Sequence, residues 1–279
     1  MTPNQILKKK VDESLRALRN GEKATVKELI SELTRAREDI NKIIRGTARF
    51  EMGYYRAMLR GIDEKINEYR GKMNKSVNAS QEVAFKSGEN LVPEIMKGAG
   101  YTYVFGKLSD ELIVTAKELS VDYIKDMTSE MRKDIARRLR QGLLKGENNY
   151  DVARGIDEII GTSKRFGYLN RADIIARMEI NRAYDTARQA KDEESAKILP
   201  GLKNQWKTGF NPRPYQNGKI YPSKAKWNHE EVDGQVRTVG EPFLVSGEEL
   251  MRPRDPNGSA ENICGCNCVL IPYIEEWPE

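Results

Sequence analysis

The chain has 279 residues, of which 32% are charged, 38% hydrophobic and 8% aromatic. This length is enough for one large domain or two modest domains with a buried core. No membrane segment is expected, because no apolar run approaches the roughly 18 residues that a membrane helix needs. The first residues, MTPNQILKKKVDES, lack the apolar stretch of a secretory signal, so synthesis and initial residence in a cytoplasm are predicted.

The net charge of +5 is unevenly distributed along the chain. Residues 201–279 contain nine Lys and Arg against eleven Asp and Glu, so they carry −2 and the first 200 residues carry +7. This asymmetry is compatible with contact to a polyanion, although it is far below the charge density of a dedicated DNA-binding domain.

Residues 1–75 are predicted to form a helical arm. Thr25-Val26-Lys27-Glu28 has the pattern of a capping box, and apolar residues then recur at helical spacing as far as Gly46. A second pattern of this kind runs from Met52 to Gly71. Charged residues fill the other faces, so a long antiparallel pair of helices is expected.

Residues 76–127 are predicted to be a connecting region of short helix and loop. Gly88 and Pro93 interrupt the helical pattern, and residues 101–105 are expected to form a loop or a small strand. Ser109 and Ser120 are each candidates for the N-cap of a helix.

Residues 128–199 are predicted to be a helical core. An amphipathic helix is expected over residues 131–145, with Lys133, Arg137 and Arg140 on the side opposite its apolar stripe. Two interpretations of this basic face are a solvated helix surface and a contact with nucleic acid. Asn149 is expected to cap a short helix over residues 150–160.

The last helix of this region is predicted to begin at Asn170 and to be apolar around nearly its full circumference as far as Ala187. A helix of this kind is buried, yet it contains Arg177 and Glu179. Buried charges have to be paired, so both residues are expected to hold a neighbouring element, with the C-terminal residues as the first candidate. Glu179 has no adjacent partner in sequence that would support a catalytic role.

Residues 200–279, called the C-terminal module below, are rich in Gly, Pro and Asn and are predicted to form a small β or α+β unit. Short β-prone runs occur at residues 235–239, 243–245 and 269–273. Such a segment has little core of its own, which is where a bound metal would contribute most to stability.

The only histidine of the chain and its three cysteines all lie in this module, at His229, Cys264, Cys266 and Cys268. In an extended strand the three alternating thiols would share one face. Together the four residues could form a Cys3His structural zinc site, although Cys-x-Cys-x-Cys spacing is only weakly diagnostic. A disulfide between two of the thiols, or buried thiols beside a surface histidine, are the alternatives.

A series of motifs occurs in a fixed order over residues 128–279. The motifs are Leu143-Leu144-Lys145-Gly146, Ile175-Ala176-Arg177-Met178-Glu179, Trp206, Asn228-His229, Val232-Asp233-Gly234-Gln235, Pro253-Arg254-Asp255-Pro256 and Cys266-Asn267-Cys268. In their order and spacing they resemble the phage head-morphogenesis family, the Mu F-like minor capsid proteins, with Met178 in place of the usual Thr and Cys264 as an additional thiol.

The resemblance implies a low-copy structural protein of a tailed phage or prophage head. It would associate with the portal protein and with the major capsid or scaffolding protein in the head interior, after assembly in the host cytoplasm. Contact with packaged double-stranded DNA, during assembly or ejection, is a further implication. Asp233, which follows His229 in the motif, would belong with Arg177 and Glu179 to a structural polar network.

A different hypothesis is an enzyme, such as a metal-dependent nuclease or hydrolase, or a module linked to a toxin domain. His229, Asp233 and the thiols would then form its site. Three cysteines and one histidine would close the coordination shell, whereas a catalytic zinc site keeps one position open. The chain also lacks a nucleotide-binding glycine loop and the H-E-x-x-H motif. The sequence therefore predicts a protein that is not an enzyme.

Overall fold

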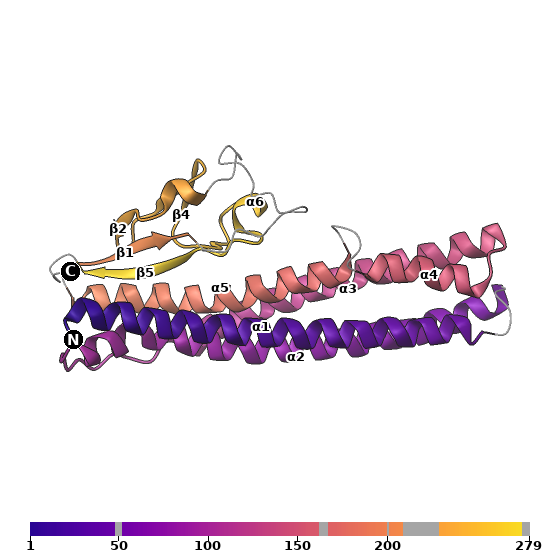
Figure 1. The fold of residues 1–279 in the computed structure, drawn as a ribbon, viewed down its shortest axis with the longest axis horizontal. Coiled ribbons are helices and arrows are strands. Elements are labelled where there is room, and N and C mark those ends of the chain that lie inside the picture. The colour runs from indigo at the N-terminus through magenta and orange to yellow at the C-terminus, as the bar shows by residue number, and fades with distance from the viewer. Residues whose placement is uncertain (48–51, 162–166, 200, 209–228, 275–279) are drawn as a thin grey trace. The chain divides into compact units, whose positions relative to one another are not determined.

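The computed structural model describes residues 1–47, 52–161, 167–199, 201–208 and 229–274. The predicted fold class is confirmed: the chain is mainly α, with a small irregular sheet region near its C-terminus (Figure 1). None of the described helices is both long and apolar enough to cross a membrane. The principal helices are α1 (Pro3–Arg45), α2 (Met52–Gly98), α3 (Asp110–Lys145), α4 (Asn149–Ile160) and α5 (Tyr168–Ala196).

The chain forms two compact units whose boundaries differ from the predicted ones at residues 75, 127 and 199. Unit 1 consists of residues 1–21, 81–116 and 178–279, and unit 2 of residues 22–80 and 117–177. The predicted boundaries followed changes in composition along the sequence. The units differ from them because α1, α2, α3 and α5 each pass from one unit into the other.

Unit 2 is a helical bundle with one continuous apolar core. Each of the five helices contributes buried residues at the helical spacing that the sequence predicted. Its fully buried members include Leu29, Leu33, Ile40, Ile62, Met73, Ile135, Leu139 and Ile156.

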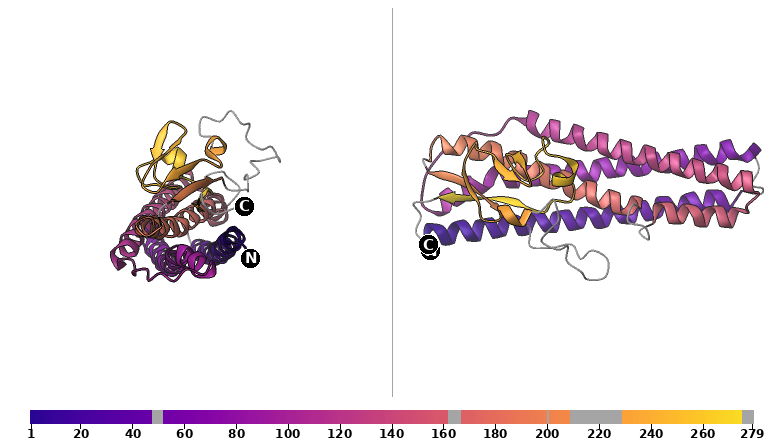
Figure 2. Two further views of the ribbon diagram at one scale, coloured as in Figure 1. Left: turned by 90° about the vertical axis from the view of Figure 1, so that its left-hand side faces the viewer. Right: turned by 90° about the horizontal axis from the view of Figure 1, so that it is seen from above.

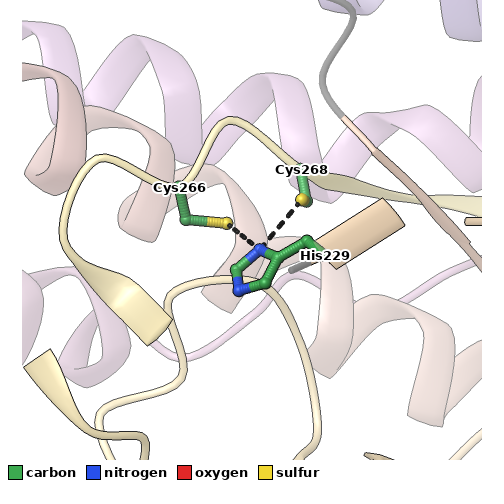
Figure 3. A group of neighbouring side chains, drawn as sticks. All are labelled: His229, Cys266 and Cys268. Carbon is green, nitrogen blue, oxygen red and sulfur yellow. Dashed lines mark hydrogen bonds between the residues drawn. The ribbon is translucent and has the colours of Figure 1, made fainter. Parts of the chain in front are cut away.

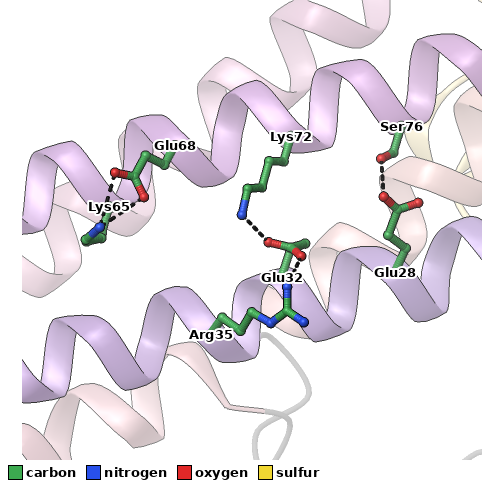
Figure 4. Close-up of polar contacts among 7 residues, drawn as sticks. All are labelled: Glu28, Glu32, Arg35, Lys65, Glu68, Lys72 and Ser76. Carbon is green, nitrogen blue, oxygen red and sulfur yellow. Dashed lines mark hydrogen bonds and ion pairs between the residues drawn. The ribbon is translucent and has the colours of Figure 1, made fainter.

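Polar contacts along the surface of unit 2 fix the register of α1 against α2 (Figure 4). Lys72 Nζ donates to Glu32 Oε2 over 2.6 Å, and Ser76 Oγ donates to Glu28 Oε1 over 2.9 Å. Later residues of α2 contact earlier residues of α1, so the two helices run antiparallel in this unit, as predicted. Exposed pairs of this kind contribute well under about 1 kcal/mol each, and the buried core is the main source of stability.

Helix α2 does not end in the region where its glycines and proline predicted a break. It continues through Gly88 and Pro93 to Gly98 as one helix. Packing overrides the low helix propensity of these residues, because Leu91, Val92 and Ile95 are buried in unit 1. Residues 101–109 then form the predicted loop without a strand.

Gly88 is required for the close approach of α2 to α5 within unit 1. A Cβ atom added at Gly88 would lie 2.4 Å from the carbonyl oxygen of Tyr184. Gly88→Ala is therefore expected to destabilise unit 1 by about 1–3 kcal/mol, although alanine is intrinsically the better helix former. Urea unfolding monitored by circular dichroism measures this. Gly71→Ala, whose added Cβ meets no atom within 4 Å, is the control and should stabilise the helix.

Of the three residues that were predicted to be helix N-caps, two do not occupy an N-cap position in the structure. Ser120 is buried inside α3, where its hydroxyl donates to Lys117 O, whereas Ser109 does accept a hydrogen bond from Glu111 N at the start of that helix. The cap of α4 is Asn148 rather than Asn149, since the Asn148 side chain accepts from Asp151 N over 2.9 Å.

The C-terminal module contains a three-stranded antiparallel sheet in the order β2-β1-β5 and a β3-β4 hairpin. The predicted runs are confirmed as β2 (Val236–Thr238), β3 (Phe243–Val245) and β5 (Val269–Ile274). The sequence analysis missed β1 (Leu202–Lys207) and β4 (Glu248–Leu250). In unit 1 the sheet lies along the C-terminal part of α5 (Figures 1 and 2).

The module has its own small apolar core, centred on Trp206. The Trp206 side chain is fully buried and lies 5.3 Å from the Phe243 ring, measured between ring centroids. Strand β1 contributes Trp206, which stands opposite Leu270 of β5 in the sheet register. The rest of this core is Val232, Val245, Leu250 and Cys268, with Cys266 packed against it.

Candidate metal centre

His229 is held in one orientation at the edge of this core. It begins the short 3-10 helix His229–Val232, and its ring meets Trp206 edge-on with 6.1 Å between the ring centroids. Its Nε2 atom lies 3.0 Å from Asn262 Oδ1. Its Nδ1 atom lies 3.3 Å from Cys268 Sγ and 3.5 Å from Cys266 Sγ (Figure 3).

The three cysteines do not share one face, because the segment that contains them is not a continuous strand. Cys264 follows the short helix α6 (Ala260–Ile263), and Gly265 turns the chain with a φ of 74°. Cys264 is exposed, Cys266 is half-buried and Cys268 is buried just before β5. The structure therefore brings together His229, Cys266 and Cys268, and it leaves Cys264 outside this group.

The geometry of this group suits a tetrahedral metal ion. One ligand atom from each residue lies within 4.8 Å of the other two. In a tetrahedral zinc site with ordinary Zn–S and Zn–N bonds, nitrogen and sulfur ligands are about 3.6 Å apart. The two N–S distances of 3.3 and 3.5 Å are close to this value. Among the described residues, no other group of His, Cys, Asp and Glu has this proximity.

The charges around the group favour the metal-binding form of a thiol. Hydrogen bonding with Cys268 and His229, together with the charge of Arg254, lowers the pKa of Cys266 well below its ordinary value, although burial opposes this shift. Burial lowers the pKa of His229, but its contact with Cys266 outweighs burial and the net shift is upward. A thiolate is the form of cysteine that binds metals and acts as a nucleophile.

Arg254 connects the cysteine segment to helix α5. Its guanidinium is fully buried, and its Nη1 atom donates to Cys266 O over 2.7 Å. Its Nε atom donates to Asp185 Oδ2 of α5 over 2.9 Å. Burial raises the pKa of Asp185 to about 6, against the opposing effect of Arg254. The sequence analysis had included Pro253-Arg254-Asp255-Pro256 among the motifs of the resemblance and had assigned Arg254 no contact with α5.

A second buried arginine, Arg188 of α5, attaches the sheet to the helix. Its Nη1 atom donates to Leu270 O of β5 over 2.8 Å, and its Nε atom donates to Asp192 over 3.2 Å. Asp185, Arg188 and Asp192 therefore form a charged stripe on α5 that faces the module. The signal in the sequence was their spacing of three and four residues, which places the three side chains on one side of the helix.

The three residues of the predicted polar network lie in different surroundings. Arg177 pairs with Asp173 and with Glu22 inside unit 2. Glu179 is fully buried in unit 1 and accepts from Arg182 over 2.7 Å. Asp233 precedes Gly234, whose φ is 80°, and accepts from Thr208 N and Lys207 Nζ.

The predicted basic face of α3 is exposed in unit 2. Lys133, Arg137 and Arg140 are all exposed, and Met131, Ile135 and Leu139 on the opposite side are buried. Arg137 donates to Asp134 of the same helix, which neutralises part of the face. Within the described residues no ion pair involves Lys133 or Arg140.

Comparison with known proteins gives two distant similarities. Over 162 residues, 58% of the chain, it is 24% identical to the NAD(+)--arginine ADP-ribosyltransferase EFV of Enterococcus faecalis. Over 92 residues it is 33% identical to the uncharacterized protein YqbB of Bacillus subtilis. The matched segments span 30% and 27% of these relatives, less than a third of either. No family model matches the chain, and no solved structure matches it.

The similarity to an ADP-ribosyltransferase corrects one prediction. The sequence analysis predicted that the chain is not an enzyme, because it found no motif for a nucleotide or for a catalytic metal. The 24% identity to a protein named for enzymatic transfer contradicts this prediction.

Proposed function

We propose that this chain is a minor capsid protein of a tailed phage or prophage that acts in head morphogenesis. The observation that supports the proposal is the convergence of several of the C-terminal motifs on which the resemblance rests. Trp206, His229, Arg254, Cys266 and Cys268 are separated by up to about sixty residues, yet they contact one another in one small module. Chance matches along a sequence would not be expected to meet in space.

The proposed partners are the portal protein and the major capsid or scaffolding protein, in the interior of the head. The long helices have charged exposed faces, and such faces can dock against a ring of subunits whose surface carries complementary charges. The C-terminal module, attached through the buried Arg188 and Arg254, is a firmly held element for such a contact.

The test of this proposal is the composition of particles from the strain that carries the gene. Heads and tails are separated after induction and each is analysed by quantitative mass spectrometry. A few copies per head, absent from tails and lost from heads without a portal, are the expected result. Detection only in the soluble host fraction, with normal heads after deletion of the gene, would overturn the proposal.

Contact with double-stranded DNA is proposed for the basic face of α3. Replacing Lys133, Arg137 and Arg140 by alanine should weaken DNA binding and reduce the slope of log affinity against log salt by about 2.7, for three phosphate contacts. Fluorescence anisotropy over a salt series measures this slope. The control removes Lys8, Arg16 and Arg19, three exposed basic residues of α1. An equal loss in both triple variants would show that the α3 face has no particular role.

A second candidate function is transfer of ADP-ribose from NAD+ to arginine, and the similarity to the Enterococcus faecalis protein favours it. In this reaction the bond between ribose and nicotinamide breaks and nicotinamide leaves. A guanidinium nitrogen forms the new bond to ribose and loses a proton. Incubation of the purified chain with labelled NAD+ and an arginine-rich protein tests it. Labelled product together with released nicotinamide would support the candidate. The absence of both products would exclude this activity for this chain.

A further inference from the structure

The chain contains one histidine and three cysteines, the residue types that most often bind zinc in proteins. Three of these four side chains converge on one point, with His229 Nδ1 directed at both sulfur atoms of Cys266 and Cys268 (Figure 3). We propose that these three atoms bind one zinc ion, and that Cys264 is not a ligand. No further His, Cys, Asp or Glu of the described part of the chain joins the group, so the fourth position of the ion is then open to water or a small exchangeable ligand.

The choice of Nδ1 as the ligand atom follows from the contacts of Asn262. This buried side chain donates from its Nδ2 atom to Val245 O over 3.3 Å, which directs its Oδ1 atom toward His229. An amide oxygen only accepts, so the hydrogen of the imidazole has to be on Nε2. The lone pair is then on Nδ1, the atom that faces the sulfurs. Asn262 is thus a positioning residue of the site.

Arg254 supports the two cysteine ligands from the other side. Its hydrogen bond to Cys266 O holds the backbone between the ligands, and Asp185 holds the guanidinium in turn. This buried arrangement fixes the loop before any metal binds. A site whose ligands are already in place binds an ion without the cost of ordering the chain.

The exclusion of Cys264 distinguishes this site from a closed Cys3His cluster. Cys264 is exposed and follows α6, and the turn at Gly265 separates it from the group. Its sulfur is not among the ligand atoms that lie within 4.8 Å of one another. Zinc with three protein ligands keeps an open position, which is the arrangement of catalytic rather than structural sites.

The first experiment measures metal content of the full chain, purified without chelator, supplied with zinc and desalted. One zinc per chain is expected for the wild type and for the matched control Cys264→Ser. Cys266→Ser, Cys268→Ser and His229→Ala should each lose it. Absence of zinc from the wild type, or loss of zinc in Cys264→Ser comparable to that in Cys266→Ser, would overturn the proposal.

A second measurement on the wild type avoids variants that fail to fold. In the zinc-loaded protein one thiol, that of Cys264, should react rapidly with Ellman's reagent, and a chelator should expose the other two. Equal reactivity of all three thiols with and without chelator would contradict the site.

Cobalt substitution tests the open position. The visible spectrum of the cobalt protein should be the same in the wild type and Cys264→Ser, and it should change when imidazole or a small thiol is added. A spectrum that differs between the two proteins and does not respond to added ligand would assign Cys264 as the fourth ligand, against the proposal.

Discussion

Arg254→Ala is expected to lower the free energy of unfolding of the C-terminal module by about 3–5 kcal/mol. The substitution leaves the Asp185 carboxylate buried without its charge partner and removes the hydrogen bond to Cys266 O. Both losses occur in the protein interior, where neither group can form a hydrogen bond with water instead. This is the contact through which α5 holds the cysteine segment, so the effect should be concentrated in the module.

The measurement is urea unfolding followed by tryptophan fluorescence and, in parallel, by circular dichroism. All three tryptophans, Trp206, Trp227 and Trp277, lie within residues 200–279 of the sequence, and the fluorescence of Trp206 reports on the core of the module, where this side chain is fully buried. Circular dichroism reports mainly on the helices. The fluorescence transition should shift to lower urea by more than the helical transition.

The protonation of Asp185 makes the expected effect of Arg254→Ala depend on pH. Burial already raises its pKa to about 6, and without Arg254 the carboxyl can avoid an unpaired charge by taking up a proton. The effect of Arg254→Ala should therefore be smaller at pH 5 than at pH 8. An effect that is the same at both pH values would show that the ion pair is not its cause.

Two further variants serve as controls for Arg254→Ala. Arg237→Ala removes a half-buried arginine of the same module whose hydrogen bonds, among the residues that the structure describes, go to Val236 and Gln235. It should cost less than about 1 kcal/mol. Replacing both partners, as Asp185→Leu with Arg254→Met, should restore much of the lost stability, because a buried pair exchanged for apolar residues is often neutral.

The stability of unit 1 is expected to decrease as the pH rises from about 5 to 8, and Glu179 should be the main cause. Burial raises the pKa of Glu179 from 4.5 to about 7, although Arg182 opposes the shift. No described residue bonds to its Oε2 atom. The folded state therefore holds a proton that the unfolded state releases between these pH values. The stabilisation is complete below pH 4.5 and is lost as the pH rises through about 7, at a cost of roughly 3 kcal/mol.

Glu179→Gln tests this dependence. The amide cannot ionise, and its oxygen can still accept from Arg182, so the decrease in unfolding free energy between pH 5 and pH 8 should be reduced by roughly 3 kcal/mol. A smaller dependence should remain, because Asp185 is shifted in the same direction. Glu249→Gln changes an exposed carboxylate of the same unit and is the control. An unchanged profile in Glu179→Gln would assign the pH dependence to other groups.

Much of the helical architecture could be predicted from residue periodicity. The apolar spacing along residues 25–46 and 52–71 corresponds to the buried faces of α1 and α2, and Met131, Ile135 and Leu139 face the core as expected. Such faces can be predicted because a helix places every third or fourth residue on one side, whatever surrounds it. The helix break predicted at Gly88 and Pro93 was wrong, because tertiary packing overrides the low helix propensity of these two residues.

The sequence by itself determined the mainly helical class, the change in texture near residue 200 and the gathering of His229 with the cysteines in the last part of the chain. Only the tertiary structure decided which of these residues meet. Gly265 turns Cys264 away, and Arg254 and Arg188 attach the module to α5. These arrangements depend on contacts between residues up to about eighty positions apart, which a local sequence pattern does not predict. A buried charge is stable only beside a partner that neutralises it, and this partner can lie anywhere in the sequence.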